Sequence, residues 1–139
     1  MQVKINRVDD AFHFEALGSA PNIKIHIDGA LAIGGNNQGV RPMELLLMGL
    51  GSCSAFDLLI ILKKQRQIVD DIQITVDGVR NEHQVPSVFT HIHIHFALKG
   101  RLEQDKVSKA CELAVTKYCS VHDMLVKTAS ITYDFSILN

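Results

Sequence analysis

Apolar and polar residues alternate in three short segments near the N-terminus, at about residues 3–5, 12–16 and 23–27. A period of two is typical of a β-strand that buries one face and exposes the other. The stretch GGNNQGVRP (34–42) that follows is rich in residues that tolerate unusual backbone angles. The pattern therefore predicts three short strands and then a loop.

A long apolar segment comes next. Pro42 suits the first position of a helix, and the cations of KKQRQ favour the negative end of the helix dipole, so we predict a helix from about 42 to 66. Residues 43–62 are long and apolar enough to span a membrane. Glu44 and Asp57 lie within that stretch, and glycines interrupt it. We therefore expect a central helix covered on more than one face, and no membrane.

The second half of the chain predicts two long strands, a second helix and a last strand. Apolar residues alternate over 71–80 and 88–98, and the two runs are typical of an antiparallel pair joined around 81–87. Residues 131–137 alternate again as a closing strand. A stripe with helical spacing lies between them, formed by Val107, Ala110, Cys111, Ala114, Val115 and Tyr118. The predicted fold class is α+β, with antiparallel β-sheets and two long helices.

Composition narrows the class of protein. The chain has 139 residues, and 14 Lys+Arg nearly balance 15 Asp+Glu. This length favours a single domain over 1–139, and the near-neutral charge argues against nucleic acid as a partner. Three cysteines do not make a secreted disulfide framework, and MQVKINRVDD lacks the apolar run of a signal peptide. We expect a cytoplasmic location.

The three cysteines are the main candidates for chemistry. Cys53 lies in the first helix among small residues, and Cys119 lies at the end of the second helical stripe. Cys111 is central in that stripe, where a free cysteine behaves as a small hydrophobe. Cys53 and Cys119 are 66 residues apart and lack CxxC spacing, so the pattern alone leaves open whether they are a redox pair.

RPMELLLMGLGSCSAFDLL, together with the distant KYCSV, resembles the OsmC/Ohr family, the osmotically induced and organic hydroperoxide resistance proteins. FTHIHIHFALKG and CSVHDML are most similar to its YhfA-like branch. The resemblance implies an OsmC-like fold in an intertwined homodimer, with the long helices central and no cofactor. It also implies a peroxidase in which Cys53 attacks an organic hydroperoxide and becomes a sulfenic acid. Cys119 would then form a disulfide with it, which a dithiol reduces.

The resemblance further implies an arginine that activates Cys53, because the thiolate is the reactive form. Residues 8–40 contain no arginine, which leaves Arg7 and Arg41. Arg41 is either this partner or a solvated loop cation. The family's glutamate directly follows the helix-starting proline, whereas here Glu44 comes one residue later. Glu44 is therefore either catalytic or a carboxylate that bonds the free N–H groups of the first turn.

A histidine cluster offers another kind of site. His91, His93 and His95 share one face of a predicted strand. Three imidazoles along one strand do not reach one ion comfortably, so we interpret them as a solvated or interface surface and expect no metal. Two functions stay open: a peroxidase for organic hydroperoxides, or a non-catalytic dimer that senses redox state or binds a small ligand.

Overall fold

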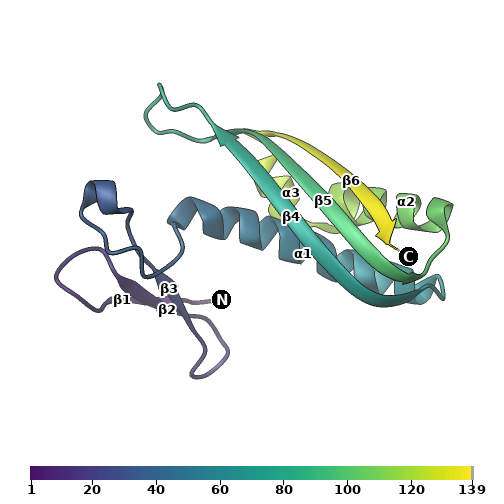
Figure 1. The fold of residues 1–139 in the computed structure, drawn as a ribbon, viewed down its shortest axis with the longest axis horizontal. Helices are drawn as coiled ribbons and strands as arrows, with labels where there is room; N and C mark the ends of the chain where they lie inside the picture. The colour runs from purple at the N-terminus through teal and green to yellow at the C-terminus, as the bar shows by residue number, and fades with distance from the viewer. Residues whose placement is uncertain (139) are drawn as a thin grey trace. The chain divides into compact units, whose positions relative to one another are not determined.

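The computed structural model describes residues 1–138. The chain forms two compact units, one from Met1 to Leu46 and the other from Leu47 onward, and both are drawn in Figure 1. The single domain expected over 1–139 stays a prediction.

The first unit contains the three predicted short strands. They are β1 (Lys4–Arg7), β2 (Phe14–Leu17) and β3 (Lys24–Ile27), which form an antiparallel sheet in the order β1-β2-β3. A single helical turn, η1 (Leu31–Ile33), lies in the loop that follows. Ile5, Ala16 and Ile25 are cross-strand partners, so they lie on one face of the sheet. Ile5 and Ile25 are exposed, and this apolar face is uncovered in the single chain.

The predicted long helix is α1 (Pro42–Lys64). Its buried side repeats every four residues, as helical geometry requires, through Leu50, Ser54, Leu58 and Leu62. Gly51 faces the second sheet so closely that an added Cβ would lie 2.8 Å from Val76 Cγ2. The opposite side carries exposed Met48, Phe56 and Ile60. One side of the helix is therefore buried in the chain and the other is not.

The second sheet has the order β4-β5-β6, from β4 (Ile68–Arg80), β5 (Phe89–Arg101) and β6 (Ser130–Leu138). Strands β4 and β5 are the long antiparallel pair that the alternation predicts. In β5 the inward residues Ile92, Ile94, Phe96 and Leu98 are fully buried. Gly100 has φ +148°, and a Cβ there would meet the Ile68 carbonyl oxygen at 2.1 Å. Glycine thus permits the irregular register at this end of the pair.

The last strand differs from the prediction, because β6 pairs with β5 in parallel. The connection between them runs through α2 (Gln104–Leu113), the π-helical turn η2 (Ala114–Tyr118) and α3 (Ser120–Leu125). A helical crossover returns the chain to the starting end of the sheet, so the next strand runs in the same direction. The predicted second helix is divided into α2 and η2, and α3 follows Cys119 as a separate helix that the pattern did not predict. Figure 1 shows α1, α2 and α3 behind this sheet in the view drawn.

Helix α1 is long and apolar enough to span a membrane, and a third of its most apolar window is buried in the chain. Its buried side nevertheless packs on a sheet, as in the core helix of a globular fold. The buried side of α1 therefore agrees with the expectation of a central helix.

Candidate active site

Two of the three cysteines meet in the second unit. Cys53 is half-buried at the middle of α1, whereas Cys119, between η2 and α3, is only 4% exposed. The Cys119 thiol lies 4.0 Å from the Leu50 carbonyl oxygen, on the turn of α1 that precedes Cys53. The Cys53 side chain is near enough to act on the pKa of Cys119 through a hydrogen bond and through charge. The fold therefore brings two free thiols close together that are 66 residues apart in sequence.

The backbone around Cys119 places its sulfur at the start of α3. The π-helical turn ends when the Cys119 N–H donates to the Ala114 carbonyl oxygen at 3.1 Å. Cys119 then takes extended backbone angles and becomes the residue that caps α3. Its sulfur accepts a hydrogen bond from the His122 N–H at 3.3 Å. Single π-helical turns occur often at functional sites, where they reorient one side chain.

The surroundings of Cys119 favour the protonated thiol. Burial raises the pKa of Cys119, and the neighbouring Cys53 raises it further. The nearby Ser54 hydroxyl and the hydrogen bond from the His122 N–H oppose this rise in the pKa. Donors to sulfur stabilise the thiolate, whereas burial and a second negative charge destabilise it. Cys119 therefore favours the protonated thiol, and nearby polar groups are placed to stabilise its thiolate when it forms.

Cys111 differs from the pair. It is fully buried in α2, and burial raises its pKa to about 12. A thiol in such surroundings is inert toward oxidants at neutral pH. The structure therefore agrees with the interpretation of Cys111 as a core residue.

Arg41 and Glu44 lie in the first unit, where their side chains make local bonds. The Arg41 guanidinium donates to the carbonyl oxygens of Asp28, at 3.2 Å, and Gly39, at 3.0 Å, and to Asn37 Oδ1. The Glu44 carboxylate accepts from the Arg41 N–H at 2.9 Å. This is the helix-start bond expected of a carboxylate at the third position. Catalytic roles for both residues stay predictions.

The chain is similar to known proteins over most of its length. The sequence model of the family described as OsmC-like protein matches residues 35–134, which include both cysteines. The chain belongs to the OsmC-like family. It is 39% identical over 121 residues to Protein YhfA of Escherichia coli K12, an alignment that covers 86% of this chain and 87% of that protein. The resemblance inferred from the sequence motifs is therefore confirmed.

Solved structures show the same fold. A hypothetical protein from Aquifex aeolicus VF5 is 32% identical, with a TM-score of 0.80 over 99% of this chain and 97% of its own. An organic hydroperoxide resistance protein OsmC from Legionella pneumophila is 15% identical, with a TM-score of 0.72 over 97% and 95%. At that identity the likeness concerns the fold alone. Helix α1 is thus part of the OsmC fold.

Two other candidate residues of this OsmC-like chain lie beside the thiol pair in sequence. Asp57, one turn after Cys53, lines a hollow of about 370 Å³ together with Lys64 and Tyr118. Burial lowers the pKa of the His122 imidazole, while its backbone N–H serves Cys119. A second hollow, also of about 370 Å³, is lined by Cys119 and by polar residues that include Lys117 and Asp123. Cys119 thus lies at the wall of a hollow, although little of its side chain is exposed there.

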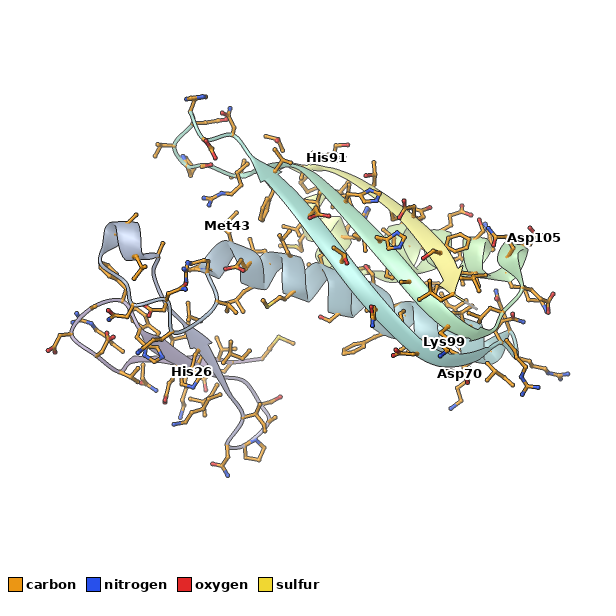
Figure 2. The ribbon with its side chains drawn as sticks, viewed as in Figure 1. His26, Met43, Asp70, His91, Lys99 and Asp105 are labelled. Carbon is orange, nitrogen blue, oxygen red and sulfur yellow. The ribbon has the colours of Figure 1, made fainter. Side chains whose placement is uncertain are left out.

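The histidines form a hydrogen-bonded ladder on the outer face of the β4-β5-β6 sheet, where Figure 2 labels His91. His93 Nδ1 lies 2.7 Å from Thr132 Oγ1, and Asp134 bonds His95 and lies 3.4 Å from His93 Nε2. The sequence pattern did not reveal this carboxylate, because parallel pairing of β6 brings it there. No group of three metal-binding side chains in residues 1–138 is placed to hold an ion.

Sequence reasoning also missed Ser54. The residue is fully buried beside the thiol pair. The signal was present, because Ser54 is in phase with the buried leucines of α1. A polar residue at an apolar position of such a stripe is informative.

Proposed function

We propose that the protein is a thiol-dependent peroxidase that reduces organic hydroperoxides and uses a dithiol as reductant. The observation that carries the proposal is the meeting of Cys53 and Cys119, two free thiols from distant parts of the chain. The Legionella protein of the same fold is described as an organic hydroperoxide resistance protein. We also propose a cytoplasmic location, where thiols are kept reduced.

The cycle has three balanced steps. The Cys53 thiolate attacks the terminal peroxide oxygen, the O–O bond breaks, and a Cys53 sulfenic acid and an alkoxide form. The alkoxide takes up the proton that the Cys53 thiol released and becomes an alcohol. The Cys119 sulfur then attacks the Cys53 sulfur, with loss of water, and a disulfide forms. A dithiol reduces this disulfide and becomes a disulfide itself. The raised pKa of Cys119 suits a thiol that reacts second.

Steady-state turnover tests the proposal. With cumene hydroperoxide and an excess of dithiothreitol, the protein should consume many equivalents of peroxide per chain. Cys53→Ser should be inactive, whereas Cys119→Ser should react once and then over-oxidise at Cys53. Cys111→Ser is the matched control and should keep full turnover, because its thiol is buried and inert.

A redox sensor is the second candidate, favoured by the carbonyl and amide oxygens that already bind the Arg41 guanidinium. A sensor would consume about one equivalent of peroxide and stop. The expected activation of Cys53 by Arg41 has its own test. Arg41→Ala should slow alkylation of Cys53 by iodoacetamide at neutral pH, because a nearby cation favours the thiolate. Unchanged alkylation kinetics would remove Arg41 from the mechanism.

We further propose that the active form is a homodimer. The exposed side of α1 carries Met48, Phe56 and Ile60, and the β1-β2-β3 sheet exposes Ile5 and Ile25. Each of these exposed apolar surfaces is unusual on a soluble monomer, and an isologous contact with a second copy would remove it. Sedimentation at low micromolar concentration should give a species of twice the chain mass. A stable folded species of 15.4 kDa would contradict this proposal.

A further inference from the structure

Ser54 is buried without a conventional hydrogen bond. Its side chain is 0% exposed, and its Oγ has no hydrogen-bond partner of good geometry among residues 1–138. Buried hydroxyl groups are almost always paired, because leaving one unpaired in the interior costs free energy. The unpaired Ser54 hydroxyl lies next to two free thiols, so we relate it to the chemistry of those thiols.

Ser52, two residues earlier on the same helix, shows the ordinary alternative. Its hydroxyl donates to the Met48 carbonyl oxygen at 2.7 Å, four residues back, as mid-helix serines commonly do. The equivalent acceptor for Ser54 is the Leu50 carbonyl oxygen. That oxygen is instead approached by the Cys119 thiol, at 4.0 Å. The Cys119 sulfur thus lies at the turn of α1 to which Ser54 belongs, and the Ser54 hydroxyl keeps its proton available there.

One hydrogen-bond donor to the Cys119 sulfur is already in place. The His122 N–H reaches this sulfur at 3.3 Å from the start of α3. A thiolate accepts more than one hydrogen bond, and each donor stabilises the anion relative to the thiol. The hydroxyl of Ser54 on α1 and the N–H of His122 on α3 therefore both lie near this sulfur, although the structure pairs only the N–H with it.

We propose that Ser54 is a positioning residue for Cys119, whose hydroxyl donates to the Cys119 thiolate when that thiolate attacks Cys53 and when it leaves again. The inference deepens the proposed function and rests on it for the kinetic part. In the attack, the S–S bond forms as the S–O bond of the sulfenic acid breaks. The hydroxide that leaves takes up the proton that Cys119 released, so that one water forms. In the reduction by a dithiol, the S–S bond breaks and the Cys119 thiolate reappears.

The interaction with Ser54 lowers the pKa of Cys119, against the larger effect of burial, which raises it. The hydroxyl therefore offsets part of the cost that the buried site imposes on the anion. Loss of the hydroxyl should raise the Cys119 pKa by about one unit, a tenfold smaller thiolate fraction at neutral pH. A thiolate of higher pKa is a better nucleophile by about threefold per unit. The net expectation is a resolving step that is about threefold slower.

The first experiment measures the Cys119 pKa without peroxide. Cys53→Ala provides the background, because it removes the neighbouring thiol without adding a hydroxyl. Alkylation of Cys119 by iodoacetamide is followed against pH by peptide mass spectrometry. When Ser54→Ala is combined with Cys53→Ala, the half-alkylation pH should move upward by about one unit. When Ser52→Ala, the matched control, is combined with Cys53→Ala, the half-alkylation pH should stay unchanged. The same half-alkylation pH in all three proteins would overturn the proposal.

The second experiment follows the resolving step in the chain with all three cysteines. After one equivalent of cumene hydroperoxide, Ser54→Ala should form the Cys53 sulfenic acid as fast as the wild type. It should then form the disulfide about threefold more slowly and give more dimedone adduct at Cys53. Ser52→Ala should match the wild type at both steps. Equal disulfide rates in Ser54→Ala and the wild type would contradict the role assigned to Ser54.

Thermal unfolding separates this role from a structural one. Ser54→Ala should melt no lower than the wild type, because alanine removes an unpaired buried hydroxyl. A Ser54→Ala protein that unfolds readily would show that the hydroxyl supports the fold instead, and would overturn the proposal. If the wild type forms no disulfide, the peroxidase proposal fails, and the alkylation experiment still decides the role of Ser54.

Discussion

The two compact units bury their side chains to very different extents. In the first unit only Asp28 and Gly35 are buried, and the strands β1, β2 and β3 are exposed or half-buried along their length. In the second unit β5 buries five large apolar residues, and α1 and α2 lie behind the sheet in Figure 1. A three-stranded sheet is stable only with a covered apolar face. The second unit thus has its own core, whereas the first leaves its apolar face exposed, and we propose that a second copy covers that face.

The largest expected effect tests the core of the second unit. Phe96→Ala in β5 removes a fully buried ring and should lower the free energy of unfolding by about 3–5 kcal/mol. Phe12→Ala in the first unit removes a ring that is 45% exposed and should cost about 1 kcal/mol or less. Urea unfolding at a fixed protein concentration measures both values. Equal costs would contradict the difference between the units.

A smaller effect is expected from the exposed side of α1. Phe56→Glu places a charge where we propose a second copy packs, so the dimer dissociation constant should rise about tenfold or more, ~1.4 kcal/mol. Far-UV circular dichroism should be unchanged, because Phe56 is 67% exposed in the single chain. Val85→Glu is the control, because Val85 is an apolar residue that is 96% exposed in the β4–β5 loop. Sedimentation that fails to distinguish the two variants would remove α1 from the interface.

The smallest expected effect concerns the loop of the first unit. The Asp28 carboxylate accepts from the backbone N–H groups of Gly29, Asn36 and Gln38. The N–H of Gln38 contributes most to a pKa below the ordinary value of 3.8. Since the folded pKa is lowered, ionised Asp28 stabilises the loop at any pH above the ordinary value, and this contribution disappears as the pH falls through the lowered pKa.

Amide NMR shifts of Asn36 and Gln38 measure this transition. Their midpoint should lie below 3.8, and amides of β5 should not follow it. In Asp28→Asn, the same amides should lose the low-pH transition. A midpoint at or above the ordinary carboxyl value would show that the three N–H groups do not hold the carboxylate in solution.

Much of the fold was predictable, because alternation and helical stripes report local burial. The pattern placed all six strands and started α1 at Pro42, where the structure starts it. It assigned antiparallel pairing throughout, although a helical segment between two strands is itself a signal for parallel pairing. The π-helical turn at Ala114–Tyr118 was not predictable. One turn whose hydrogen bonds span five residues instead of four leaves the spacing of the apolar residues almost unchanged.

The site was predictable only in part. Periodicity could not show that Cys53 and Cys119 meet, because contacts over 66 residues depend on the whole fold. The family motifs supplied that pairing. Ser54 could have been found as a polar residue in phase with Leu50 and Leu58. Its unpaired hydroxyl and the donor from His122 required the three-dimensional arrangement.

One measurement tests the central claim most directly, namely that Cys53 and Cys119 form one redox centre. The reduced protein is treated with one equivalent of cumene hydroperoxide, and its peptides are mapped by mass spectrometry without reduction. We predict an intramolecular disulfide between Cys53 and Cys119, with Cys111 still a free thiol. A disulfide that involves Cys111, or the absence of any disulfide, would contradict it.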